Sequence, residues 1–255
     1  MKIALIGSGR VASCMGPRLK KAGHTIAAVY SRTMEHAQEL AGVLGALAFD
    51  RLETLPEADV YLTMLSDDAL TALASEIVKV CPDSLFLHTA GSIHMNIWKD
   101  AGAQRYGVLY AMQTFSKGAD IDWPQVPFFV EGCNPAELEI IRNLASDLSG
   151  KVTELSSEGR KKLHVAAVFT CNFSNHMYAI AERLLASEGV PFSVMLPLVR
   201  ETARKVETMS PQDAQTGPAI RGDRKVINEH LELLKDYPEY AELYRLISTD
   251  INKKI

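Results

Sequence analysis

Short apolar runs alternate with amphipathic segments along the first part of the chain. Lys2–Ile6 ends at a glycine, and Thr25–Tyr30 is a second run of the same kind. An apolar run that stops at a turn residue is typical of a buried parallel strand. Helical spacing follows each run, beginning near Arg10 and again over Met34–Leu44, where Gly45 provides a C-terminal stop. The pattern therefore predicts repeated strand and helix units from the first residues onward.

The same alternation continues to about residue 155. It predicts further strands at residues 59–65, 84–88, 105–112, 126–131 and 151–155, and helices at 67–80 and 135–148. Asp67 and Asp68 fit the start of a helix, where negative charge favours the helix dipole. Strands and helices that alternate in this way predict an α/β fold, with a Rossmann-type doubly wound parallel sheet over residues 1–155.

The pattern changes after residue 156, because no later run resembles a strand. Helices are predicted at residues 157–187, 192–208, 224–235 and 239–251, with a Pro- and Gly-containing loop at 210–222. The first of them is about thirty residues long and apolar on nearly all sides, so we expect it to be buried, with a subunit interface as one setting. We therefore expect a second, all-α domain over residues 156–255.

Charge and cysteine content exclude several classes of protein. The 255 residues include 27 Lys and Arg against 31 Asp and Glu, a net charge of −4, so no basic surface for nucleic acid or an anionic membrane is expected. The first apolar run is too short for a signal peptide, and no stretch reaches the length of a membrane span. The four cysteines are scattered without metal-ligand spacing, which favours a reduced cytoplasmic protein without a bound metal.

A glycine-rich turn follows the first predicted strand. Gly7-Ser8-Gly9-Arg10-Val11-Ala12 fits the Gly-x-Gly-x-x-Gly/Ala fingerprint between a strand and a helix. Glycine allows the tight turn and a close approach of the backbone to a pyrophosphate, while the helix N-terminus offers unpaired N–H groups to the anion. The sequence predicts that this turn binds a dinucleotide; a glycine turn without a ligand is the alternative.

The end of the second strand discriminates between the two nicotinamide dinucleotides. An NAD site usually has a carboxylate here, whereas this chain has Ser31, Arg32 and Thr33. Arg32 can form charge-assisted hydrogen bonds to a 2′-phosphate, and the two hydroxyls can add donors. This favours NADP(H). In the alternative interpretation, Arg32 is a solvated surface charge and Thr33 caps the next helix.

Two more strand ends are expected at the same edge of the sheet. Leu65 and Ser66 follow one strand and are expected beside the ribose and pyrophosphate. Thr89 follows the next strand and is also expected to contact the cofactor.

Polar side chains interrupt the long apolar helix. At about 100° per residue, Asn172 lies about 80° from His164, and Asn175 about 20° from it, so the three share one stripe. Buried polar groups are costly unless paired, so this stripe suggests a cleft lining. His164 could donate a proton and Asn172 could orient a carbonyl. The alternatives are backbone capping or hydrogen bonds across a subunit interface. His88 competes for the proton-donor role, although a contact with the nicotinamide ribose or a local hydrogen bond is as plausible.

Three further residues are candidates for substrate binding. Gln113 and Thr114 follow a strand and could contact a substrate. Arg221 lies in a Gly- and Pro-containing loop and could bind a carboxylate in a bidentate manner. A rigid connection with an internal pair between Arg221 and Asp223 is the alternative.

The sequence resembles a family over essentially its whole length. The resemblance is carried by His88-Thr89-Ala90-Gly91, by residues 164–169 together with Asn172, and by residues 216–223. The N-terminal half looks like the NADP-binding domain of pyrroline-5-carboxylate reductases, β-hydroxyacid dehydrogenases and deazaflavin-dependent NADP oxidoreductases. The C-terminal half looks like the helical domain of a little-characterised group of NADP oxidoreductases. The resemblance implies a Rossmann domain, a helical dimerisation domain and a substrate cleft between them, and hence a homodimer.

The chain departs from its relatives at three places. The family tends to have serine in place of Ala90 and a His-Pro pair in place of Tyr110-Ala111. If Asn172 matches the asparagine of β-hydroxyacid dehydrogenases, their catalytic lysine falls at Val168, so lysine-type hydroxyacid chemistry is not expected.

These observations lead to two hypotheses of different classes. In the first, the protein is an NADP(H)-dependent oxidoreductase that reduces a small carbonyl or imine by hydride transfer, with a deazaflavin as a further possible redox partner. In the second, it is a non-catalytic NADP(H) sensor whose helical domain presents a partner surface. Substrate-dependent loss of NADPH absorbance separates the two.

Overall fold

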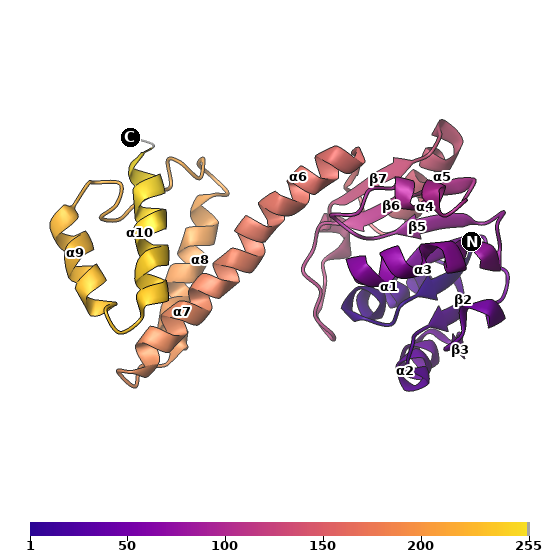
Figure 1. The fold of residues 1–255 in the computed structure, drawn as a ribbon, viewed down its shortest axis with the longest axis horizontal. Helices are drawn as coiled ribbons and strands as arrows, with labels where there is room; N and C mark the ends of the chain where they lie inside the picture. Colours follow the sequence, from indigo (N-terminus) through magenta and orange to yellow (C-terminus); the bar gives the residue numbers. More distant parts are fainter. Residues whose placement is uncertain (254–255) are drawn as a thin grey trace. The chain divides into compact units, whose positions relative to one another are not determined.

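The structure is a computed structural model that describes residues 1–253. The chain divides into two compact units, Met1–Cys171 and Asn172–Ile255, and each is described separately (Figure 1). The division falls inside the long helix, whereas the sequence pattern changes at residue 156. The domain boundaries 1–155 and 156–255 stay a prediction, because they concern function as well as compactness.

An eight-stranded sheet forms the centre of the first unit (Figure 1). Its strands lie in the order β3-β2-β1-β4-β5-β6-β7-β8. The strands are β1 (Lys2–Ile6), β2 (Thr25–Tyr30), β3 (Leu47–Phe49), β4 (Val60–Thr63), β5 (Leu85–His88), β6 (Arg105–Ala111), β7 (Phe128–Gly132) and β8 (Val152–Glu154). The order reverses direction between β1 and β4, which is the topological switch point where ligands bind in such sheets.

Helices cover both faces of this sheet. Helices α1 (Arg10–Lys21), α2 (Met34–Leu44) and α5 (Pro135–Ser146) bury apolar side chains in one core cluster. Helices α3 (Asp67–Val80) and α4 (Asn96–Asp100) bury theirs in a second cluster on the other face. The near-continuous apolar strands follow from this arrangement, because both faces of the sheet are buried. The predicted doubly wound α/β fold is confirmed.

Three details of the first unit differ from the prediction. Strand β7 pairs antiparallel with β6, although a wholly parallel sheet was expected. The segment between them contains no crossover helix, and an antiparallel neighbour does not require one. Strand β3 and helix α4 were not predicted, because segments of three and five residues are too short to show a period.

The C-terminal part of the described chain is helical, as predicted. It consists of α6 (Ser157–Ala167), a π-helical turn (Val168–Phe173), α7 (Ser174–Ala186), α8 (Leu196–Lys205), α9 (Arg224–Leu233) and α10 (Pro238–Asn252). A short 3₁₀ turn, Phe192–Met195, precedes α8. The π turn interrupts the predicted long α-helix. Angles worked out at 100° per residue therefore do not hold between His164 and the two asparagines, because a π turn is wider than an α turn.

The second unit leaves most of its apolar side chains exposed. In the described part of this unit, Ala219 and Leu234 are the only buried residues. The expectation that the long helix is buried is not met within one chain, since no residue between 168 and 186 is buried. Large exposed apolar residues of this unit include Tyr178, Val190, Val194, Leu196, Leu198, Val206, Met209, Leu233, Leu246 and Ile247. Among residues 1–253, no helix combines the length and hydropathy that a membrane crossing requires.

Candidate functional site

The glycine turn after β1 is held against two neighbouring strands. The Gly7 N–H donates to the Tyr30 carbonyl at 2.9 Å, at the end of β2. The φ angle of Gly7 is 120°, and a Cβ at this position would come within 2.5 Å of the Met64 carbonyl oxygen. Both the backbone conformation and the close approach require glycine here. The turn is thereby fixed at the carboxyl edge of the sheet.

The second glycine of the fingerprint leaves open space at the start of α1. Gly9 is the N-cap of the helix, and no atom lies within 4 Å of the place where its Cβ would be. No side chain caps the helix, and no acidic residue lies in its first turn. Its first N–H groups are therefore available to an anion, and their dipole favours negative charge. This geometry fits a dinucleotide pyrophosphate. Of the other predicted residues, Arg10 is exposed, while Ser8 and Val11 are half-buried.

Arg32 lies exposed immediately beyond β2 and forms no ion pair within residues 1–253. Its neighbours are ordered by the backbone: Ser31 N–H donates to the Phe49 carbonyl at 3.0 Å, and Thr33 N–H to Ser31 Oγ at 3.5 Å. Thr33 is the N-cap of α2, but its side chain makes no capping hydrogen bond. The Arg32 guanidinium is thus free to meet an anion at this edge.

The ends of β4 and β5 lie at the same edge. Thr89 is tied to β4, because its N–H donates to the Thr63 carbonyl at 3.2 Å and its hydroxyl approaches the same oxygen at 3.4 Å. Leu65 is half-buried, and Ser66 is the exposed N-cap of α3, without a side-chain capping bond. The structure therefore brings the predicted cofactor residues to one edge of the sheet, around the switch point.

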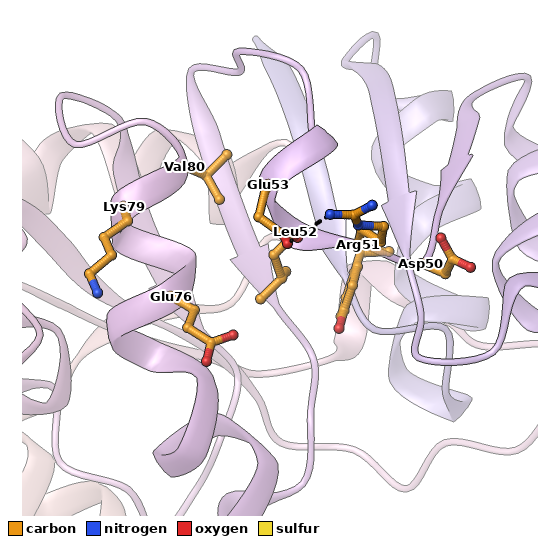
Figure 2. A pocket seen from close by; sticks show the side chains of 8 residues that line it. Asp50, Arg51, Leu52, Glu53, Glu76, Lys79 and Val80 are labelled. Carbon is orange, nitrogen blue, oxygen red and sulfur yellow. Dashed lines mark hydrogen bonds and ion pairs between the residues drawn. The ribbon is translucent and has the colours of Figure 1, made fainter.

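A separate cavity of about 630 Å³ lies between the segment after β3 and the C-terminal half of α3 (Figure 2). Its charged lining is mixed, with Asp50 and an Arg51–Glu53 pair at 3.3 Å on one side, and Glu76 and Lys79 of α3 on the other. The lining does not include the glycine turn or Arg32. The mixed charge gives this cavity no preference for an anion.

His88 is fully buried at the end of β5. Its Nδ1 accepts a hydrogen bond from the Ala90 N–H at 3.2 Å, and its ring lies 6.3 Å from that of Trp98. Burial, followed by the positive charges of Arg160 and His94, lowers the pKa of His88 to about 3. The neutral ring therefore carries its proton on Nε2, which is buried without a hydrogen-bond partner among the described residues. This arrangement favours the local hydrogen bond that the sequence left open as an alternative to proton donation.

His164 lies on α6 and contacts the sheet edge within the first unit. Its Nδ1 is 3.1 Å from the Tyr110 hydroxyl on β6, and the two rings meet edge to face with centroids 6.1 Å apart. A Cβ on Gly91 would come within 2.6 Å of the His164 Cγ and 3.0 Å of its Cβ. The imidazole therefore rests directly on a glycine backbone, which only a residue without a side chain permits.

One helical turn earlier, a buried ion pair fastens α6 to the same edge. Arg160 is fully buried, and its Nη1 donates to Glu131 Oε2 at 2.8 Å. Arg160 also donates to the Ala90 and Ile93 carbonyls and to the Ser157 hydroxyl. Glu131 in turn accepts from the Ser157 N–H at 2.9 Å and from its hydroxyl at 2.6 Å. We call Arg160, Glu131 and Ser157 the clasp; it fixes the start of α6 and thereby His164.

The remaining predicted site residues are Gln113 and Thr114 in the first unit and Asn172, Asn175 and Arg221 in the second. Gln113 and Thr114 are exposed after β6, and the Gln113 side chain accepts from the Thr114 N–H at 2.8 Å. Arg221 is exposed, and Asp223 caps α9 through the Val226 N–H rather than pairing with Arg221. The asparagines at 172 and 175 belong to the second unit, so their association with His164 stays a prediction.

Sequence reasoning missed the clasp and the contact between Tyr110 and His164. Arg160 resembles any solvated charge on a helix, and Glu131 is simply the end of an apolar strand. The one available signal was Tyr110, which stands where relatives tend to have histidine. No group of three or more His, Cys, Asp or Glu side chains within residues 1–253 could hold a metal ion.

Comparisons with known proteins agree with this geometry. The family described as coenzyme F420-dependent NADP oxidoreductase matches residues 2–90, and a domain of unknown function, DUF2520, matches residues 126–251. Two distant structures share the fold: an imine reductase from Myxococcus stipitatus in complex with NADP⁺ (18% identity, 99% and 92% of the two chains, TM-score 0.67) and 1-pyrroline-5-carboxylate reductase from Streptococcus pyogenes (16%, 99% and 98%, TM-score 0.64). No curated protein matches the chain.

A nearer relative is a protein of Bacteroides fragilis described as a putative NADP oxidoreductase. It is 46% identical to this chain, with 99% of this chain and 98% of that one covered and a TM-score of 0.94. The chain belongs to the same family as this protein, and it combines an NADP oxidoreductase domain at residues 2–90 with the domain of unknown function at residues 126–251.

Proposed function

We propose that this protein is an NADP(H)-dependent reductase that transfers a hydride to a small carbonyl or imine substrate. The observation that carries the proposal is the open N-terminus of α1 behind Gly9, at the switch point of the sheet. When bound, NADPH supplies the hydride. The protein supplies binding, orientation and a proton.

The choice of NADP(H) over NAD(H) rests on Arg32. Its guanidinium is exposed and unpaired within residues 1–253, where an NAD site would have a carboxylate. A 2′-phosphate beside it gains charge-assisted hydrogen bonds, which NADH cannot make. We expect Arg32→Ala to reduce the preference for NADPH over NADH by about tenfold or more, equivalent to about 1.4 kcal/mol. An unchanged preference, measured by equilibrium binding of both dinucleotides, would remove the assignment.

His164 is the proposed proton donor. Its ring lies against Gly91, which follows β5, and Tyr110, near the end of β6, at the sheet edge that the proposed nucleotide site shares. We further propose that Asn172 and Asn175 line the substrate cleft, with Asn172 orienting the reacting carbonyl. Gln113, Thr114 and Arg221 are proposed substrate contacts, with Arg221 suited to a carboxylate.

The direct test is NADPH consumption, followed by absorbance, with a panel of small carbonyl and imine compounds. We expect turnover by the wild-type protein and a loss of about 100-fold or more in His164→Ala, the range for removal of a positioned acid. His176→Ala, an exposed histidine of the second unit, is the matched control. Tight NADPH binding without turnover across the panel would favour the sensor hypothesis. A deazaflavin tested as acceptor in the same assay separates that branch of the oxidoreductase class.

We also propose that the protein is a homodimer that pairs through its second unit. In the described part of that unit only two residues are buried, while many large apolar side chains stay exposed. A helical unit of this size needs a larger apolar core than one copy supplies, and a second copy would provide it. Light scattering after gel filtration should give about 56 kDa, twice the 28.0 kDa of one chain. A mass of one chain at micromolar concentration would refute the proposal. The cytoplasmic location expected from the cysteines stays a prediction, which cell fractionation can test.

A further inference from the structure

The contact between Tyr110 and His164 gives the imidazole a partner on one nitrogen. Tyr110 is 8% exposed, and its hydroxyl lies 3.1 Å from Nδ1. The only other polar contact of this hydroxyl within residues 1–253 is the Met112 sulfur at 3.9 Å, a weak acceptor. An imidazole nitrogen is a better hydrogen-bond acceptor than a thioether sulfur, so the Tyr110 hydroxyl donates to His164 Nδ1. The neutral ring then carries its own hydrogen on Nε2.

The surroundings keep the phenol protonated and the ring in place. Burial raises the pKa of Tyr110, while the positive charge of Arg160 acts in the opposite direction. The resting group is therefore a neutral phenol with a hydrogen to donate, beside a buried cation that can stabilise a transient phenolate. Gly91 below the ring and the clasp one turn earlier leave the imidazole little freedom to turn away.

We propose that Tyr110 is a positioning residue that fixes the tautomer of His164 and replaces the proton that His164 gives up. The inference rests on the proposed function. As hydride reaches the substrate carbon, the Nε2–H bond breaks and a new O–H or N–H bond forms on the substrate. The Tyr110 O–H bond breaks at the same time and an Nδ1–H bond forms. Nε2 then takes a proton from the solvent as the Nδ1 hydrogen returns to the phenolate oxygen, which restores the neutral phenol and the Nε2–H tautomer of the starting state.

The tautomer can be measured without any substrate. In the full-length protein with ¹⁵N-labelled histidine, two-bond ¹H–¹⁵N NMR spectra distinguish Nε2–H from Nδ1–H, and loss of one signal set in His164→Gln assigns this residue. We expect Nε2–H in the wild type and a mixture of tautomers in Tyr110→Phe. Tyr106→Phe removes a hydroxyl from the same strand that makes no hydrogen bond within residues 1–253, and it should leave the signal unchanged. An Nδ1–H tautomer in the wild type, or an unmoved signal in Tyr110→Phe, would overturn the inference.

Turnover gives the second readout. With a substrate from the panel, Tyr110→Phe should lower kcat by about tenfold or more while the KM for NADPH stays within about twofold, since the cofactor contacts are intact. An unchanged kcat would contradict the relay. If the wild type turns over no substrate, the proposed function fails, but the tautomer still decides the role of Tyr110. Equal unfolding midpoints of the two phenylalanine variants exclude a general loss of structure.

Discussion

Replacing Arg160 by methionine tests whether the clasp holds the site together. Methionine keeps the length and most of the apolar stem of the side chain, but it removes the charge and all donors. The Ala90 and Ile93 carbonyls lose a partner, and the Glu131 carboxylate loses its counter-ion. The Arg160 side chain is 1% exposed and that of Glu131 is 13% exposed, so water cannot readily replace these bonds.

The expected cost follows from this burial. Breaking a buried ion pair on one side costs about 3–5 kcal/mol, because the remaining charge stays buried without compensation. Here Glu131 keeps two hydrogen bonds from Ser157, at 2.9 and 2.6 Å, which favours the lower end of that range. We therefore expect Arg160→Met to lower the free energy of unfolding by about 3 kcal/mol. Arg160→Met combined with Glu131→Gln should cost less than the sum of the two single changes.

Tryptophan fluorescence during urea unfolding is a suitable assay. The chain has two tryptophans, Trp98 and Trp123, and both lie in the first unit, so the signal reports on the unit that contains the clasp. Arg142→Met is a matched control, because Arg142 forms only exposed pairs with Glu139 and Glu154 and should cost less than about 1 kcal/mol. If Arg160→Met costs no more than Arg142→Met, the clasp does not stabilise this unit and the reasoning is wrong.

Three further predictions concern the glycine turn, the packing of His164 on Gly91, and the pH dependence of stability. Gly9→Val should weaken NADPH binding about tenfold or more, measured by titration, without changing the midpoint of thermal unfolding. Gly7→Ala should lower that midpoint, because Gly7 has a φ angle of 120° and faces the Met64 carbonyl. Gly91→Ala should displace the His164 imidazole and lower kcat about tenfold or more with an unchanged Kd for NADPH. A fully active variant would contradict the proposed role of the contact between Gly91 and His164. The pKa of His88 is about 3 in the folded protein against about 6.5 in the unfolded chain, so the unfolded chain binds more protons between these two pH values. The free energy of unfolding should therefore fall as the pH drops below about 6.5, by up to about 1.4 kcal/mol per pH unit. His88→Gln should have a shallower pH dependence above pH 4.5, and an equal slope would refute the assignment.

Local patterns were sufficient to predict the nucleotide half of the fold. The strands Lys2–Ile6 and Thr25–Tyr30 are buried on both faces, so their sequences are near-continuous apolar runs, which solvent-exposed segments do not have. The glycine turn between them includes Gly7, whose φ angle of 120° and close approach to Met64 few residues tolerate, so the tight turn could be predicted from the sequence, while its binding of a dinucleotide stays a prediction. The direction of β7 could not be predicted, since the choice depends on pairing between strands and not on their composition.

The candidate site beyond the glycine turn could be predicted only in part. The sequence identifies His164 as a polar residue on an apolar helix, but its neighbours come from residues more than fifty positions earlier, including Tyr110 and Gly91. Contacts of this range depend on how α6 begins, and that is fixed by the buried Arg160, whose charge gave no sign of burial in the sequence. The π turn likewise leaves no local signature, yet it alters which faces of the helix align.

His164 and Tyr110 meet within the unit that also carries the glycine turn, although His164 lies beyond the last strand of the sheet in the sequence. The parts proposed to bind the dinucleotide and to handle the proton are therefore inherited together. A change confined to the residues from Asn172 onward therefore does not separate these two parts. The proposed substrate contacts, by contrast, come from both units, with Gln113 and Thr114 in the first and Asn172, Asn175 and Arg221 in the second.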